Sequence, residues 1–466
     1  MNELLIPLDR NASVPLYMQI YHKIKQEIIE GRLKPHTSLP SIRRLSEQLG
    51  VNKATLETAY DHLVMEGLIE SLPRSGYYVQ EIDTSYMRKK MPPHLPSSQH
   101  HASYPYGFHL DHVDIHHFPV ATWRRLMNEV LNDHAFQILN TGDPQGERGL
   151  RVQIAEYVRR VRGVHCTAEQ IVIGSHSQVL LLLLSNLLDL RGKRIAVGEP
   201  GYSAVTGLFE SYGCKIETIS LENDGFHRGE LDHSKASIVF TSPSFQYPFG
   251  SLMKIQERIY LLKWACSHNA YIIEDDHLSE FRYAGDLIPS LQNLDREERV
   301  IYMGTFHGSL SPAINIGYMI LPPHLLLAYN DSRNSFQQTT SRIEQKTLEL
   351  FMERGHWEQH RFRMKEIYRK KYKAMVQAIQ TCFQEKAEVW EGQTGLHLVM
   401  QVHSDESEQE LLYKANQAGI HLVSFRETWY KKDKYPYTWP TFLLGFGGLT
   451  IEEIQTGIAL LHESWF

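Results

Sequence analysis

The stretch LPSIRRLSEQLGVNKATLETAYDHLVMEGLIESLPRSGYYV, residues 39–79, decides the fold of the N-terminal part of this chain. Pro40 and Ser41 are typical of a helix start, and the apolar residues that follow them supply a buried face. Gly50 suits the turn that ends this helix, and Asn52 suits the cap of the next one. The stretch therefore predicts two short helices joined by a tight turn.

The residues on either side complete the unit. The helix that Asn52 caps ends at Gly67. Two apolar runs then flank the turn residues 73–76, which predicts a two-stranded hairpin. Upstream, another helix that ends at Gly31 is indicated by apolar residues four positions apart: Leu16, Ile20, Ile24 and Ile28. Three helices followed by a hairpin are typical of a winged helix-turn-helix, whose third helix enters the major groove of DNA.

Candidate DNA contacts follow from this arrangement. The first residues of the third helix are expected at base edges, and Arg43 and Arg44 on the preceding helix at phosphates. Arg74 at the wing tip is expected at the minor groove or its phosphates. The predicted set is Ser41, Arg43, Arg44, Asn52, Lys53, Thr55, Arg74 and Ser75.

The order of residues in 39–79 closely resembles the DNA-binding domain of the GntR family of bacterial regulators. The resemblance covers nearly all of residues 12–80 and implies a double-stranded DNA operator as the partner. Most members have an arginine near the position of Lys53, and its absence here leaves the operator sequence open. The alternative is a three-helix adaptor domain whose Arg and Lys side chains are merely solvated.

Composition agrees with a cytoplasmic protein of more than one domain. The chain has 466 residues, 42% hydrophobic and 22% charged, and four cysteines without a metal-like spacing. The N-terminus does not resemble a signal peptide, and the longest apolar run, 179–184, is too short to span a bilayer. Net charge is −6, so DNA binding has to come from the placement of a few basic residues rather than from bulk charge.

The remainder of the chain predicts a linker and a large α/β domain. Residues 81–108 are rich in Pro, Ser and His and predict an extended linker. Beyond it, short apolar runs alternate with helical stretches, which indicates a mostly parallel sheet with helices on both faces. These runs are 171–173, 195–197, 238–240 and 271–273. In such sheets, ligands bind at the carboxyl ends of the strands.

The loops after these runs resemble those of fold-type-I aminotransferases, which use pyridoxal phosphate. The matching motifs are TGDPQGERGLR (141–151), EPGY (199–202), TSPSFQYPFG (241–250), IIEDDHLSEFRY (272–283) and GTFHGSLSPAINIGYMILP (304–322). Together with the GntR-like head, they make the chain similar to the MocR subfamily of regulators. The resemblance implies a homodimer, and it names pyridoxal phosphate as the family cofactor.

Several positions depart from the aminotransferase pattern. Gly308 stands where the family has the lysine that bonds covalently to the cofactor, and Asn315 stands where it has the phosphate-binding arginine. His176 replaces a small residue in the phosphate-binding turn, and His277 replaces the tyrosine that bonds the ring hydroxyl. No arginine follows Arg426, so a C-terminal arginine that clamps the substrate carboxylate is also missing.

Other pocket positions keep the family's residue. Asp275 matches the aspartate that pairs with the pyridine nitrogen, and Tyr202 matches an aromatic near the ring; a capping carboxylate and plain packing are the respective alternatives. Phe245 replaces a residue that is often polar. The predicted degenerate pocket is His176, Gln178, Tyr202, Gln246, Asp275, His277, His307, Gly308, Ser309 and Asn315.

Three hypotheses for this pocket stay open: a small-molecule effector site, a metal site, or no ligand in a body that only dimerises. No metal ligands are assigned, because 25 histidines make some clustering expected by chance. The sequence thus predicts a winged helix-turn-helix (1–80), a linker (81–108) and an aminotransferase-like α/β domain (109–466). Its predicted function is DNA-binding transcriptional regulation without transamination and without covalently bound pyridoxal phosphate. The alternative is an active aminotransferase with a DNA-binding appendage.

Overall fold

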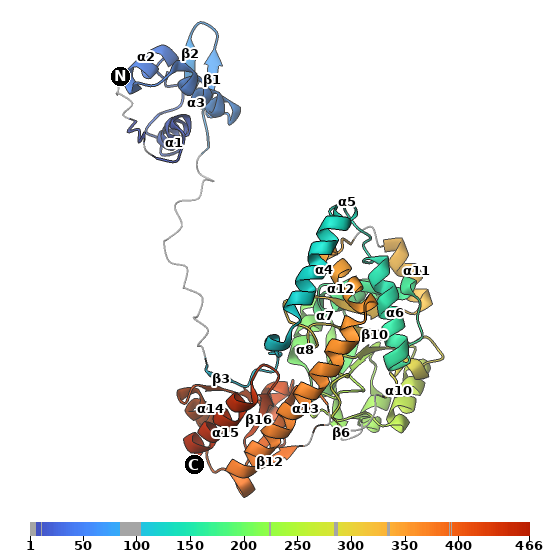
Figure 1. The fold of residues 1–466 in the computed structure, drawn as a ribbon. Helices are drawn as coiled ribbons and strands as arrows, with labels where there is room; N and C mark the ends of the chain where they lie inside the picture. The colour runs from blue at the N-terminus through green and yellow to red at the C-terminus, as the bar shows by residue number, and fades with distance from the viewer. Residues whose placement is uncertain are drawn as a thin grey trace. The chain divides into compact units, whose positions relative to one another are not determined.

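The computed structural model of the protein describes residues 6–10, 12–83, 104–222, 225–283, 288–332, 336–390, 392 and 394–466. The chain divides into two units, residues 1–101 and 102–466, which are described separately below (Figure 1). Among the helices of the described residues, none has both the length and the apolar character that crossing a bilayer requires.

The N-terminal unit has the predicted three helices and hairpin. These elements are α1 (Leu16–Ile29), α2 (Ile42–Leu49), α3 (Lys53–Met65), β1 (Ile69–Leu72) and β2 (Gly76–Val79). Ser41 caps α2 by accepting a hydrogen bond from the backbone N–H of Arg44, and Asn52 caps α3 by accepting one from Ala54. Gly50 has the positive φ of 61° that the turn between these helices requires.

The core of this unit holds α2 and α3 in place. Ile20 and Ile24 of α1 pack with Leu56 and Leu63 of α3, and all four side chains are fully buried. The Tyr60 hydroxyl donates a 2.9 Å hydrogen bond to the carbonyl of Pro40, which connects α3 to the residue before the cap of α2. The exposed N-terminal ends of α2 and α3 are therefore attached to a rigid base.

The C-terminal unit contains an eight-stranded, mostly parallel sheet. Its spatial order is β4 (Ile171–Gly174), β11 (Gly317–Ile320), β10 (Val300–Thr305), β9 (Tyr271–Asp275), β8 (Ile238–Thr241), β5 (Arg194–Glu199), β6 (Lys215–Glu222) and β7 (Gly225–Phe226). Strands β10, β9, β8, β5 and β6 pair in parallel, whereas β11 and β7 run antiparallel to their neighbours. The predicted α/β class is confirmed, and each of the four predicted apolar runs lies in a strand.

Helices cover both faces of this sheet, as its continuous apolar strands require. In β4, Ile171 and Ile173 face one apolar cluster and Val172 faces another. The first face is covered by α4 (Val120–Asp133), α6 (Arg148–Arg162), α10 (Ile255–Ser267) and α12 (Arg342–Glu353). The second face is covered by α7 (Ser177–Leu187), α8 (Ser203–Tyr212) and α11 (Pro323–Ser332).

A smaller α+β layer follows the long helix α13 (His356–Phe383) (Figure 1). Its antiparallel sheet has the order β12 (Ala387–Trp390), β13 (His397–Val402), β16 (Thr441–Gly445) and β15 (Val423–Ser424). Helices α14 (Glu408–Gln417) and α15 (Ile451–Trp465) share its apolar core with α13. A separate strand pair joins β14 (Ile420–His421) to β3 (Tyr106–Gly107).

The predicted linker of 81–108 ends earlier than expected. Its residues 84–103 lie outside the described part of the chain. However, Tyr106 and Gly107 form β3, and Phe108 is fully buried in the core of the C-terminal unit. Residues 104–108 therefore belong to the second unit, since an edge strand and a buried aromatic ring fix them there. At the other end, Ile82 packs against the core of the N-terminal unit.

Candidate functional site

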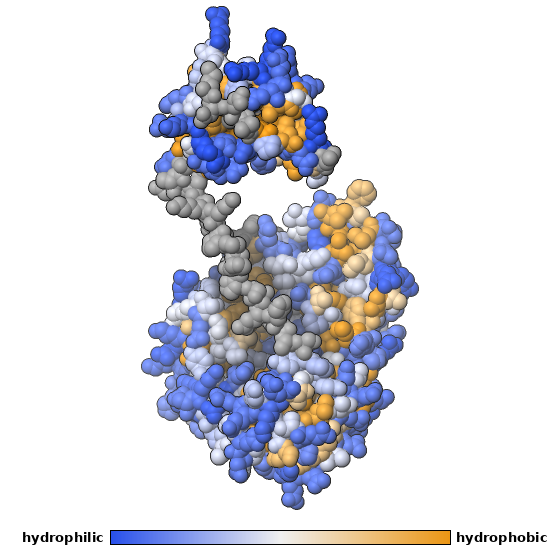
Figure 2. Space-filling view, turned by 90° about the vertical axis from the view of Figure 1, so that its left-hand side faces the viewer, coloured by the Kyte–Doolittle hydropathy of each residue, from blue (hydrophilic) through white to orange (hydrophobic). Residues whose placement is uncertain are grey.

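The predicted DNA-contacting residues lie on exposed helix ends of the N-terminal unit. Arg43, Arg44 and Lys53 are exposed in the first turns of α2 and α3, and the Arg43 side chain is 79% exposed. Arg43 forms one surface ion pair, with Glu47 at 3.2 Å. Such a pair contributes little in water, so the guanidinium is available to a phosphate. Figure 2 shows hydrophilic side chains over much of the visible face of this unit.

Two kinds of side chain occur among the other predicted contacts. Ser41 and Asn52 are engaged as helix caps, and Thr55 is half-buried beside them on α3. Arg74 and Ser75 are exposed at the tip of the β1–β2 hairpin, where Arg74 has a φ of 66°. The hairpin thus presents a cation at its tip, as a wing that approaches DNA requires.

The second site is formed where the strands of the large sheet end. His176 follows β4, Tyr202 follows β5, Asp275 ends β9 and His307 follows β10. These strand ends lie at one edge of the sheet, and the rings of His176 and His307 approach to 5.4 Å between centroids. Residues more than 130 positions apart in sequence are therefore neighbours in the fold.

Tyr202, His277 and Asp275 form a row of polar contacts. The Tyr202 hydroxyl and Nε2 of His277 are 2.5 Å apart, and Nδ1 of His277 lies 3.0 Å from the Asp275 carboxylate. Burial alone lowers the pKa of His277, but the nearby Asp275 charge and hydrogen bond outweigh burial and raise it. Burial also raises the pKa of Tyr202 well above its usual value, so the phenol keeps its proton. Asp275 is therefore engaged by a protein side chain.

His307 has the opposite electrostatic behaviour. Burial, together with the neighbouring His277 and His176, lowers its pKa to about 4. The ring is thus neutral at pH 7. Among the described residues, its Nδ1 is a buried atom without a hydrogen-bond partner. A buried polar atom of this kind is unfavourable unless water or a ligand bonds to it.

Aromatic side chains enclose this row, and among them the sequence had singled out Phe245 but not Tyr247 or His397. Tyr247 stacks on Tyr202 with 3.8 Å between ring centroids, and Phe245 meets His277 edge-on at 5.5 Å. His397 of β13 packs edge-on against both Phe245 and Tyr247, and burial lowers its pKa to about 4. The only sequence signal for Tyr247 was its place in the 241–250 motif; His397 had none.

The turn expected to bind phosphate is capped by the protein itself. His176 precedes α7, and its Nδ1 accepts a 3.3 Å hydrogen bond from the backbone N–H of Gln178. That N–H is one of the donors that an anion at a helix N-terminus would use. The Gln178 residue itself is exposed.

Gly308 lies in a crowded position. A Cβ atom placed on Gly308 would lie 2.4 Å from Cδ2 of Leu278, closer than two carbon atoms can approach. Leu278 has a φ of 59° in the turn after β9, an unusual conformation for a branched residue. A side chain at 308 would therefore require the terminal methyl group of Leu278 to move.

The remaining predicted pocket residues are dispersed. Ser309 is buried and its hydroxyl donates to Glu280, and Asn315 is exposed. Gln246 is buried and accepts a 3.1 Å hydrogen bond from Ser251, while its Nε2 has no partner among the described residues. The structure thus gathers His176, Tyr202, Asp275, His277 and His307, but not Ser309 and Asn315.

The residues present do not fit a covalently held pyridoxal phosphate. Such attachment needs a primary amine, and Gly308 stands where the resemblance places the lysine that would supply it. The carboxylate of Asp275 faces His277, and the amide at the start of α7 is bonded to His176. Two of the groups that such a cofactor would use, the Asp275 carboxylate and the backbone N–H of Gln178, thus already have contacts within the protein.

Family models match both units. Residues 16–79 match the family described as bacterial regulatory proteins, gntR family, and residues 111–432 match aminotransferase class I and II. The second match covers more than half of the chain. It also agrees with the fold: the structure superposes on multiple substrate aminotransferase from Thermococcus profundus with a TM-score of 0.70 and 25% identity, covering 78% of this chain and 91% of that one.

Curated relatives share both units in one chain. The chain is 36% identical to the uncharacterized HTH-type transcriptional regulator YdeL of Bacillus subtilis, over 98% of each chain. It is 30% identical to the probable rhizopine catabolism regulatory protein MocR of Rhizobium meliloti, over 99% of this chain and 96% of that one. The chain belongs to the MocR-like transcriptional regulators, in which a GntR-type helix-turn-helix domain is joined to an aminotransferase class I/II domain.

Proposed function

We propose that this protein regulates transcription by binding a DNA operator and that its aminotransferase-like domain binds a small molecule without transamination. The aminotransferase family normally uses pyridoxal phosphate, and the proposal is that here this cofactor is not bound covalently. The observation that carries this proposal is Gly308, with Leu278 against it, at the position where a lysine would be required.

Buried polar atoms without partners support the binding of a ligand that forms hydrogen bonds with them. His307 Nδ1 and Gln246 Nε2 lack partners among the described residues, and His307 is neutral at pH 7 because burial lowers its pKa. A neutral imidazole accepts or donates one hydrogen bond, so it selects a polar group without requiring a charge. The small molecule is therefore expected to be polar and to present groups complementary to an amide and an imidazole.

Dimerisation through the C-terminal unit is part of the proposal. Phe136 and Leu139, at and just after the short helix α5 (Ala135–Ile138), are 94% and 70% exposed. Ile115 and Val120 at the start of the same region are also exposed. Figure 2 shows apolar surface gathered on this unit. Exposed aromatic and aliphatic side chains of this kind are typical of protein interfaces, and a dimer would present two DNA-binding heads.

A cytoplasmic location is proposed on the same basis, because a regulator has to reach its operator. The four cysteines are free thiols, as a reducing compartment favours.

The decisive experiment combines DNA and cofactor measurements on the purified full chain. Selection from genomic DNA fragments is expected to enrich one operator sequence, with affinity that falls steeply with salt. Incubation with pyridoxal phosphate and borohydride is expected to leave no cofactor adduct in the mass spectrum of the 304–322 region. Absence of any enriched sequence would overturn the regulatory role. An adduct together with amino-group transfer would instead favour the alternative, a working aminotransferase with a DNA-binding appendage.

A further inference from the structure

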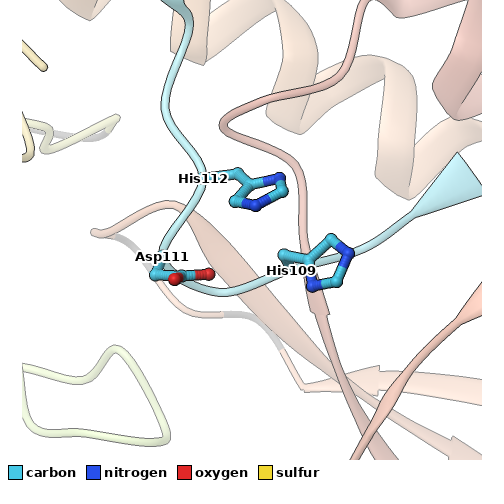
Figure 3. Close-up of side chains that lie close together, drawn as sticks. All are labelled: His109, Asp111 and His112. Carbon is cyan, nitrogen blue, oxygen red and sulfur yellow. The ribbon is translucent and has the colours of Figure 1, made fainter. Parts of the chain in front are cut away.

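Three potential metal ligands lie together outside the pocket described above. His109, Asp111 and His112 follow β3, at the start of the C-terminal unit (Figure 3). One ring nitrogen from each histidine and one carboxylate oxygen all lie within 4.8 Å of one another. The sequence offered no signal for this cluster beyond two histidines close to an aspartate.

Two glycines, one at the end of β16 and one in the loop after it, pack against the backbone of this segment. The N–H of Gly445 donates a 3.1 Å hydrogen bond to the carbonyl of Phe108. A Cβ atom on Gly445 would lie 2.0 Å from the carbonyl oxygen of His109, and one on Gly448 would lie 2.7 Å from Cβ of His112. Such close packing is possible only for glycine, and it fixes the positions from which both histidines project.

Stacking orients the first imidazole. The ring of His109 lies parallel to that of His421 in β14, at 16° and 4.3 Å between centroids. The ring of His112 lies on His109 at the same centroid distance, with a tilt of 36°. Among the described residues, none of the three side chains His109, Asp111 and His112 makes a hydrogen bond or an ion pair. Their nitrogen and oxygen atoms are therefore available to a ligand.

Two imidazoles and a carboxylate are a donor set that binds divalent first-row transition metals. Zinc binds His nitrogen at about 2.0–2.1 Å, which places neighbouring ligand atoms roughly 3.0–3.5 Å apart. Because Asp111 and His112 are exposed, small side-chain rotations bring the three atoms to that spacing. Three protein ligands leave at least one coordination position open to water or to an anion.

We propose that His109, Asp111 and His112 form a binding site for one divalent transition-metal ion of the zinc, nickel or cobalt class. None of these three residues belongs to the proposed effector pocket, although the charge of Asp111 acts on His307 of that pocket. Its residues directly follow the segment that joins the two units in sequence.

The test is a titration of the tag-free full chain with Zn²⁺ and with Co²⁺. One equivalent of Zn²⁺ per chain is expected by calorimetry and elemental analysis, and the Co²⁺ form is expected to show visible absorption from a histidine-containing site. Asp111→Asn and His112→Ala are expected to weaken binding by at least roughly tenfold, as loss of a ligand should cost no less than loss of an outer-sphere partner. Both residues are exposed, and thermal unfolding of the variants verifies that they fold.

Matched controls separate this site from other histidines. His116→Ala removes an exposed histidine from the same segment, and His100→Ala with His101→Ala removes a histidine pair upstream. Binding in these controls is expected to equal that of the unchanged protein. The proposal is overturned if Zn²⁺ binds substoichiometrically. It is also overturned if Asp111→Asn and His112→Ala bind as tightly as His116→Ala, or if the control variants lose the metal.

Discussion

The two candidate sites differ in whether their polar side chains are exposed to water or paired within the protein. In the N-terminal unit, Arg44, Lys53 and Arg74 are exposed to water, and Arg43 has only a surface ion pair. In the C-terminal unit, Tyr202 is hydrogen-bonded to His277, which lies beside Asp275, and all three residues are partly buried. A partner of the first site replaces water and counterions, whereas a ligand of the second has to compete with bonds that already exist.

Because of this difference, the first site is expected to respond to ionic strength and the second to pH. Binding at exposed cations depends on ionic strength, because released counterions contribute to its free energy. The state of the pocket depends on pH, because its histidines are shifted in opposite directions by Asp275 and by burial.

The largest effect is expected from removing the exposed cations. The triple variant Arg43→Ala, Arg44→Ala, Arg74→Ala should weaken operator binding by on the order of a hundredfold or more and reduce the salt slope by about 3. Fluorescence anisotropy over a salt series measures both quantities. Ligand binding to the C-terminal unit should not change. An unchanged salt slope would show that these residues do not contact phosphates.

The next effect concerns His307 and pH. Its pKa is about 4 in the folded protein and about 6.5 when unfolded, so the unfolded state binds more protons between these values. The resulting stability is complete above pH 6.5 and is lost as the pH falls towards 4, by on the order of 2–3 kcal/mol.

His307→Gln should remove this part of the pH dependence. Urea unfolding of both proteins at pH 7 and pH 5 measures the difference, and the variant should lose less stability on acidification. His277 acts with the opposite sign, because its pKa is raised and its contribution is lost as the pH rises. Equal pH dependence in the two proteins would contradict the buried, neutral state of His307.

A smaller effect tests the space at Gly308. Gly308→Lys should destabilise the protein by about 1–3 kcal/mol, because the new Cβ meets Leu278 at 2.4 Å. Leu278→Ala in the same chain should restore part of the loss. Gly207→Lys is the matched control: this exposed glycine in α8 has no described atom within 4 Å of an added Cβ. Chemical denaturation should show little change or a gain of up to about 1 kcal/mol there. Similar losses at both positions would refute the crowding.

The smallest effect is expected at Ser41, a predicted DNA contact whose hydroxyl is already hydrogen-bonded within the N-terminal unit. The Ser41 hydroxyl already accepts a hydrogen bond from the backbone of Arg44. Ser41→Ala should therefore lower the stability of the N-terminal unit by about 1 kcal/mol, even in the absence of DNA. Ser75→Ala serves as the control, because Ser75 is exposed at the wing tip. Thermal unfolding monitored by circular dichroism distinguishes the two variants.

Local signals explain what the sequence predicted of the fold. Caps such as Asn52 and turn glycines such as Gly50 act within a few residues, so the helices of the head were predictable to within about two positions. The antiparallel strand β11 and the smaller sheet after α13 were not predicted. Their pairing depends on contacts between segments far apart in the chain.

The pocket was predictable only in part for the same reason. Resemblance indicated which loops meet, but it did not indicate that Leu278 would fill the space beside Gly308. That contact requires the left-handed turn at Leu278, for which a leucine gives no sequence signal. The direction of Ser309, towards Glu280, likewise depends on the buried network beneath the strands.

Strand β9 ends at Asp275, and the next residue, Asp276, has different partners. Asp275 faces His277, whereas Asp276 receives two hydrogen bonds from the buried guanidinium of Arg162, at 2.7 and 3.1 Å. The residue that attaches this strand end to the helix behind it, Asp276, is thereby different from the residue that faces the proposed pocket, Asp275. A substitution at Asp275 would therefore leave the contact between Arg162 and Asp276, and with it the attachment of this strand end, in place.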